Sequence, residues 1–285
     1  MASDPTTPEE PSSLFDKFGA ALPIALTAIA TAFAGLSTSE MSNAMYWRSA
    51  AAQDQAKVND QWMLAGFKRD RSLIVQTTAA LLRAGGAPAY VPPTSPSDDP
   101  HVIAAREWLA GKGPARRELP PIDDAKIKQV LDAIRAHRPE AEVVLLAREI
   151  DPAHLEAAIS AGDDALAKFD AEMEPILREA DRLAQATPAG QAARFELDYR
   201  RYRVESSLNQ ALGFLYEVRV KHSTAYSDRH RTRSKNFFYA MLAAQIGATV
   251  ASLGLARRRQ SAIWLFAGVV GFIAVGFGTY VYLSM

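Results

Sequence analysis

Two long apolar runs dominate the C-terminal part of the sequence. Neither residues 236–255 nor residues 261–285 contain a charged side chain: the runs read NFFYAMLAAQIGATVASLGL and SAIWLFAGVVGFIAVGFGTYVYLSM. A helix needs about 20 predominantly apolar residues to cross a hydrocarbon layer of ~30 Å. A buried helical hairpin in a water-soluble core is the alternative, but a soluble helix of this length normally keeps a polar face. The pattern therefore predicts a transmembrane hairpin.

Three consecutive arginines, Arg257, Arg258 and Arg259, separate the two runs. Guanidinium groups favour head-group depth, so the triplet would end one span and precede the next. Aromatic residues, which favour membrane interfaces, stand near the ends of both runs: Phe237, Phe238, Tyr239, Trp264, Tyr280 and Tyr282.

A third apolar run, FGAALPIALTAIATAFAGLSTS, covers residues 18–39. It has the length of a span but is rich in alanine, and Pro23 lies in its first turns. A secretory signal peptide is disfavoured because the preceding tail is acidic rather than basic. An interfacial or buried helix is the other alternative. We expect an N-terminal transmembrane helix.

The middle of the chain has helical periodicity. Residues 37–84 contain no proline, and Gly85-Gly86 is a helix stop. Apolar residues recur there at near-heptad spacing: Met41, Met45, Ala52, Val58, Trp62, Ala65 and Leu73. The Pro-, Ser- and Asp-rich segment 89–100 predicts a loop.

Further helices follow the loop. Asp151-Pro152 predicts the start of a helix that reaches about residue 186. Residues 188–255 contain no breaker and are consistent with one helix of about 100 Å. The segment EVVLLARE (142–149) fits either a short helix or a strand. The long helix must bury its apolar side chains against the helices at 37–84 and 152–186.

These patterns predict an all-α integral membrane protein. Its parts are a C-terminal transmembrane helical hairpin, an N-terminal transmembrane helix and a middle domain built as a long-helix bundle or coiled coil. The expected divisions are a disordered acidic tail (1–17), a transmembrane helix (18–39), a long helix (40–86), a Pro-rich loop region with a short helix (87–124), a helical soluble domain (125–235), a transmembrane helix (236–256), a basic turn (257–260) and a transmembrane helix (261–284).

Charge and cysteine content narrow the classes of function. Lys+Arg and Asp+Glu both total 32, so no global field favours nucleic acid or acidic substrates. Cysteine is absent, which excludes disulfides, thiolate metal sites and thiol nucleophiles.

Catalytic motifs are also absent. The sequence contains no P-loop, no dinucleotide-binding glycine motif, no nucleophile elbow and no H-E-x-x-H. Asp151 and His154 share one helical turn, and His222 and His230 lie eight residues apart, but capping and solvation explain these residues better than a metal. We therefore expect a non-enzymatic protein with no catalytic residue, cofactor or metal.

A basic run, SDRHRTRSKN, precedes the first C-terminal span. Its Arg229, Arg231, Arg233 and Lys235 would lie at head-group depth and attract anionic lipid at about 1 kcal/mol per charge. A nucleic-acid site is disfavoured because the run lacks interleaved aromatic residues. The arginine triplet at 257–259 has the same expected role.

Small residues predict packing faces within the spans. Ala240, Ala244 and Ala248 recur every four residues, and Gly247 and Ala251 form an adjoining stripe. The last run offers Gly271. In lipid, helices associate through close backbone approach at small residues. These faces would act within the hairpin or between subunits of a homo-oligomer.

The segment NDQWMLAGFK (59–68), together with the N-terminal span and the hairpin split by ARRRQSAIW, resembles a bacterial membrane family, domain of unknown function 4337. Asp60, Gln61, Trp62 and Lys68 match its motif, whereas Met63-Leu64 replaces an aromatic pair. The resemblance covers the two ends of the chain but not the proline-rich insertion 87–124. It implies location and architecture only.

The sequence thus predicts an oligomeric scaffold or interaction module of the bacterial inner membrane, crossing the bilayer more than once. The alternative is a channel or transporter-like homo-oligomeric assembly. Its partners would be the lipid bilayer, further copies of itself and a protein bound by the middle domain, with no nucleic acid. The distribution of Lys and Arg favours a cytoplasmic middle domain.

Overall fold

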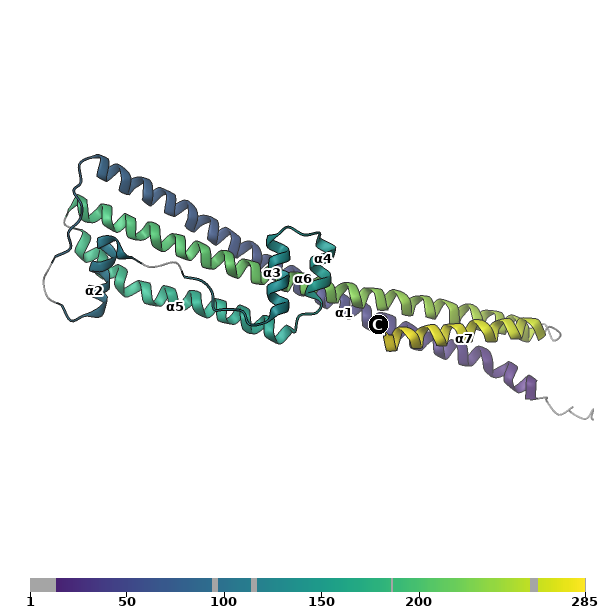
Figure 1. Ribbon diagram of the computed structural model, residues 1–285. Coiled ribbons are helices and arrows are strands. Elements are labelled where there is room, and N and C mark those ends of the chain that lie inside the picture. Colours follow the sequence, from purple (N-terminus) through teal and green to yellow (C-terminus); the bar gives the residue numbers. More distant parts are fainter. Residues whose placement is uncertain (1–13, 94–96, 114–116, 186, 257–260, 285) are drawn as a thin grey trace, which may run out of the picture. The chain divides into compact units, whose positions relative to one another are not determined.

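The computed structural model describes residues 14–93, 97–113, 117–185, 187–256 and 261–284 (Figure 1). The described residues are mostly helical and contain no β-strand, so the predicted all-α fold is confirmed. The elements are α1 (Leu14–Ala84), α2 (Pro100–Glu107), the short π-helix η1 (Trp108–Lys112), α3 (Ala125–Arg135), α4 (Glu140–Ala147), α5 (Pro152–Ala184), α6 (Pro188–Ala256) and α7 (Ser261–Ser284).

Aspartate caps fix where three of these helices begin. Asp99, Asp124 and Asp151 each stand in extended conformation before α2, α3 and α5, and each carboxylate accepts from backbone N–H groups of the first turn. Such caps satisfy donors that the helix leaves unpaired. Gly86, at φ 91°, follows the end of α1 in a conformation that favours glycine. The segment 142–149, which fitted helix or strand, lies mostly within α4.

Among the described residues, three helices have the length and apolarity of membrane spans: α1 over its N-terminal part, α6 over its C-terminal part, and α7. The chain is therefore an all-α membrane protein. Residues 1–13 of the expected acidic tail and residues 257–260 of the basic turn lie outside the described residues. Residues 14–17, which were expected to belong to the disordered tail, are helical because α1 begins at Leu14.

The chain divides into two compact units, each containing part of α1 and part of α6. The first, here called the membrane unit, comprises residues 1–48 and 226–285. Phe33, Phe237 and Val281, from α1, α6 and α7, form one buried cluster, and Ala30, Ala244 and Ala274 form another. Its three helices thus contact one another through one aromatic layer and one alanine layer.

The second, here called the extramembrane unit, comprises residues 49–225. Its largest apolar cluster joins α3, α4, α5 and α6 with Val58 of α1, and its fully buried side chains include Ile127, Leu155, Ile159, Leu212 and Leu215. Within this unit α3 lies beside α4 and α2 packs on α5 (Figure 1). A second cluster joins η1, α5 and the start of α6 around Leu109 and Leu197.

The part of α1 in the extramembrane unit buries small residues. Val58, Ala65, Ser72 and Ala79 recur every seven residues and are all less than 5% exposed. Of the near-heptad positions noted above, Val58 and Ala65 belong to this seam, whereas Met41, Met45 and Leu73 are exposed. The Ser206 hydroxyl of α6 donates to the Ala65 carbonyl at 2.9 Å, which requires close helix approach.

Candidate functional site

The segment that carries the family resemblance lies against α6. Trp62 makes an edge-to-face contact with Phe214, with ring centroids 5.0 Å apart. A Cβ at Gly213 would lie 3.5 Å from Trp62 Nε1 and from Gln61 Cβ, so this glycine leaves little spare room beside both side chains. Asp60 faces solvent. The segment therefore packs two helices together, as aromatic pairs commonly do.

Lys68 leads into a chain of ion pairs. It pairs with Glu205, which is 3% exposed and also lies 2.9 Å from Arg201 Nε. Arg201 lies 3.7 Å from Asp198, which lies 2.6 Å from Arg194. The positive and negative side chains compensate one another along α6, and the Lys68–Glu205 pair links α1 to α6.

A second charged cluster joins α1, α5 and α6. Arg219 reaches Asp54 at 2.6 Å and Glu156 at 2.7 Å. The neighbouring Tyr216 hydroxyl donates to Asp163 at 3.1 Å. Burial, followed by the adjacent Asp163 carboxylate, raises the pKa of Tyr216 to about 12. Tyr216 is therefore a permanent hydrogen-bond donor at neutral pH.

Asp124 and His154 form a pair at the start of α3, with 2.8 Å between Asp124 Oδ2 and His154 Nδ1. The hydrogen bond with His154 lowers the pKa of Asp124 and raises that of His154. Asp124 also caps α3, and Asp151 caps α5 rather than joining His154 as a ligand. Within the described residues no group of three or more His, Asp or Glu side chains is arranged to hold a metal.

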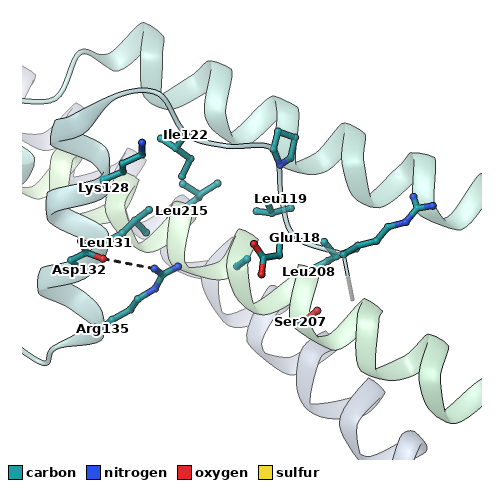
Figure 2. Close-up of a pocket in the computed structure, with 13 residues that line it drawn as sticks. Glu118, Leu119, Ile122, Lys128, Leu131, Asp132, Arg135, Ser207, Leu208 and Leu215 are labelled. Carbon is teal, nitrogen blue, oxygen red and sulfur yellow. Dashed lines mark ion pairs between the residues drawn. The ribbon is translucent and has the colours of Figure 1, made fainter. Parts of the chain in front are cut away.

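A cavity of about 530 Å³ lies among α3, α6 and residues 117–122 (Figure 2). Figure 2 shows Leu131 and Leu215 on its wall and Asp132 paired with Arg135 at the rim, 3.8 Å apart. The Arg135 guanidinium also stacks on Phe214, and Arg117 pairs with Glu172. Arg117 and Arg135 of this lining are therefore each paired with a carboxylate of the chain itself.

The basic residues before the C-terminal spans differ in their exposure. Arg229, Arg231 and Lys235 are exposed, as a head-group role requires. Arg233 is half-buried instead and lies 3.1 Å from Glu40 of α1, whose other oxygen is 2.6 Å from His230 Nδ1. Arg257, Arg258 and Arg259 lie outside the described residues.

This Glu40 contact was missed by sequence reasoning because 190 residues separate Glu40 from His230. The sequence carries a signal for this contact, since Ser37 lies at the end of the first apolar run and Glu40 just after it, while His230 and Ser234 lie just before the second. The Ser234 hydroxyl donates to the Ser37 carbonyl at 2.8 Å. A polar layer therefore joins α1 and α6 next to the apolar part of the membrane unit.

The small residues expected to form packing faces are buried. Ala240, Ala244, Gly247, Ala248, Ala251 and Gly271 all lie in the interior of the membrane unit. A Cβ at Gly247 would stand 3.4 Å from the Ala267 carbonyl oxygen and 3.6 Å from the Gly271 nitrogen, so the α6 and α7 backbones approach closely there. Leu26 of α1, which the sequence did not single out, fills the remaining space beside both glycines.

The most unusual surface of the extramembrane unit is the outer face of α1. Met63, Phe67, Ile74 and Leu81, here called the α1 stripe, are 55%, 56%, 65% and 68% exposed. At 100° per residue they fall within ~40° of one another, opposite the buried small-residue seam. Leu64 and Leu73 flank the stripe and are also exposed. The helix thus presents its large apolar side chains outward.

Asp70 lies within this surface and Arg71 borders it; neither has an ion-pair partner within the described chain. A contiguous apolar surface with polar groups of both signs marks an interaction site more often than a passive surface. Comparisons of the chain with protein-family models, with curated proteins and with solved structures find no match.

Proposed function

We propose that this protein is a non-enzymatic, membrane-anchored scaffold that self-associates through the α1 stripe. The single observation that carries the proposal is the reversed polarity of α1 in the extramembrane unit, where small residues are buried and large apolar residues are exposed. Exposed apolar surface in water is unfavourable by about 25 cal/mol per Å². A partner helix that covers the stripe would remove this penalty.

A second copy of the chain fits the stripe better than an unrelated partner. Phe67, Ile74 and Leu81 are spaced by seven residues, the repeat by which two parallel helices keep one seam in contact. Copies anchored by the same spans cross the bilayer in the same orientation, so their α1 helices would pair in parallel. Asp70 of one copy would then lie beside Arg71 of the other, and the two-fold relation would repeat the pair.

The experiment is a mass measurement of the full-length chain in mild detergent and in lipid nanodiscs. We expect at least a dimer for the natural sequence. Replacing the stripe by Met63→Gln, Phe67→Gln, Ile74→Gln and Leu81→Gln should shift the equilibrium towards monomer by at least tenfold, because four half-exposed apolar side chains lose their burial in the interface.

The matched control carries Val91→Gln, Ile103→Gln and Leu145→Gln, three exposed apolar residues of the same unit outside the stripe. It should associate like the natural chain. A natural chain that is strictly monomeric in both media contradicts the proposal, as does equal loss of association in the control.

We further propose that the extramembrane unit lies at the cytoplasmic face of a bacterial inner membrane. Support comes from basic residues near the spans on its side, which outnumber those on the other side. The family resemblance stays a prediction and agrees with this location. Labelling of a Ser97→Cys variant in intact cells tests the side, since a cytoplasmic loop excludes a membrane-impermeant reagent.

A further inference from the structure

A groove of about 400 Å³ opens on the surface of the membrane unit between α1 and α6. Thr27, Ala30, Thr31 and Ala34 line it from α1; Gln245, Ala248 and Thr249 line it from α6. Gln245 follows residue 236 by nine positions and precedes residue 255 by ten in the uncharged run. At 1.5 Å per residue it therefore lies roughly 15 Å from either end of the span, near the bilayer centre.

The hydrogen bonds of this groove are incomplete. The hydroxyls of Thr27, Thr31 and Thr249 each donate to the carbonyl four residues earlier, at 2.8, 2.9 and 2.9 Å. Their oxygens retain acceptor capacity. The Gln245 carboxamide is exposed and makes no side-chain hydrogen bond within the described residues, so two donors and one acceptor are left unpaired.

An unpaired amide in hydrocarbon is costly, by several kcal/mol on transfer scales. Acyl chains offer neither donors nor acceptors, so a lipid tail in the groove leaves the amide unsatisfied. The occupant must bring both a donor and an acceptor to the bilayer centre. It must also be slender, because Ala30, Ala34 and Ala248 make the groove shallow-walled and suited to close backbone approach.

A second copy of the same chain meets these requirements. A carboxamide is self-complementary, since its N–H₂ donates and its carbonyl accepts. A two-fold arrangement brings Gln245 of each copy to the same depth, where the two amides donate to each other and to threonine oxygens of the facing groove.

We infer that the Gln245 groove is an intramembrane self-association site, incomplete in one chain and completed by the Gln245 of a second copy. The inference rests on the self-association proposed above and adds its location within the bilayer. The inference is based on a different observation from the α1 stripe. An experiment can therefore contradict one of the two proposed association sites without contradicting the other.

The test measures energy transfer between donor- and acceptor-labelled full-length chains, each labelled at Ser97→Cys, in phosphatidylcholine vesicles. Four chains are compared: the natural sequence, the Gln stripe variant, Gln245→Leu, and the combination of both. We expect Gln245→Leu to weaken association by about tenfold, which lies within the range that model peptides give for interhelical polar contacts in membranes. Gln245→Asn, which keeps a carboxamide, should restore most of the transfer.

Ile246→Leu is the control, because this neighbouring side chain is 55% exposed and apolar in both forms. Circular dichroism of every variant checks that the helices are retained; if Gln245→Leu unfolds, Thr31→Val with Thr249→Val weakens the same groove. Unchanged transfer in folded groove variants overturns the inference, whatever the stripe variant does. Loss only in the groove variants supports it while contradicting the stripe.

Ion conductance by the natural chain that Gln245→Leu abolishes, with energy transfer intact, would assign the groove to a pore and overturn the inference.

Discussion

The membrane unit and the α1 segment of the extramembrane unit follow the same packing rule in different solvents. In the membrane unit, α6 and α7 bury Ala240, Ala244, Ala267 and Ala274, while side chains such as Phe272 face outward. In the extramembrane unit, α1 buries small residues and exposes the α1 stripe. Lipid accommodates the first arrangement, because outward apolar side chains meet acyl chains. Water does not accommodate the second.

The neighbouring α6 shows that the exposure of large apolar side chains is specific to α1 and is not a property of the whole extramembrane unit. There α6 buries Leu197, Leu208, Leu212 and Leu215, as a water-soluble helix does. The Gln245 groove is the converse mismatch, a polar surface exposed to lipid. Each mismatch is a surface whose polarity disagrees with its solvent, and each therefore points to a missing partner.

The largest expected contrast is between two leucines. Leu212 is fully buried in the extramembrane core, and Leu212→Ala should lower the free energy of unfolding by about 3–5 kcal/mol through lost burial and a residual cavity. Leu265 of α7 is 72% exposed, so Leu265→Ala should change it by less than about 0.5 kcal/mol in detergent. Thermal unfolding followed by circular dichroism measures both; similar losses would show that Leu265 is buried.

The ion-pair chain of α6 offers the next contrast. Glu205→Ala would leave Lys68 and Arg201 without their shared carboxylate, so the extramembrane unit should lose about 3 kcal/mol. Glu196→Ala, on the same helix, removes more exposed pairs to Arg83 and Arg200 and should cost about 1 kcal/mol or less. The midpoints of denaturant-induced unfolding of the two variants measure these losses. Equal shifts of the two midpoints would mean that burial does not determine how much these ion pairs stabilise the fold.

Two glycines of α7 test packing within the membrane unit. A Cβ at Gly278 would overlap the Phe33 ring, whereas a Cβ at Gly276 meets nothing within 4 Å. Gly278→Ala should therefore destabilise the unit by about 1–3 kcal/mol through overpacking. Gly276→Ala should be neutral or slightly stabilising, as alanine is the better helix former. Stability in detergent is the measurement, and the reverse order would contradict the α1–α7 contact.

The smallest expected effect is a pH dependence carried by His222 of the extramembrane unit. Burial lowers the pKa of His222, partly offset by its hydrogen bond with the backbone at Ile150. The unfolded state therefore binds a proton at a pH where the folded state does not, so stability should fall as pH decreases through the unfolded value of about 6.5.

Unfolding midpoints at pH 7.5 and pH 5.5 measure this effect, which should be on the order of 1 kcal/mol. His222→Gln should weaken the dependence, even if the variant is less stable at both pH values. His101, an exposed histidine, serves as the control through His101→Gln. An unchanged pH slope in His222→Gln would exclude His222 as its source.

Much of the fold could be predicted from the sequence because its signals are local. Asp-Pro pairs begin α2 and α5, and uncharged runs of sufficient length identify the candidate spans. The polarity of α1 could not be predicted, because apolar periodicity does not say which of two faces a neighbour covers. Ala65 is buried through the close approach of Ser206, a contact 141 residues away in sequence.

The candidate sites divide in the same way. The exposure of Arg229 and Lys235 follows from their place beside an apolar run, whereas the turn of Arg233 towards Glu40 depends on how α1 and α6 meet. The sequence identifies Gln245 as a polar residue within an uncharged run. The groove beside it could not be predicted, because Thr27 and Thr31 of α1 form its other wall.

Cysteine cross-linking in native membranes tests most directly whether the α1 stripe meets a second copy. The chain contains no cysteine, so a single Ile74→Cys substitution has no background. Oxidation should convert Ile74→Cys chains into a species of twice the chain mass, and should not do so for Asp170→Cys on the exposed side of α5. Cross-linking at both positions alike, or at neither, would contradict self-association through the stripe.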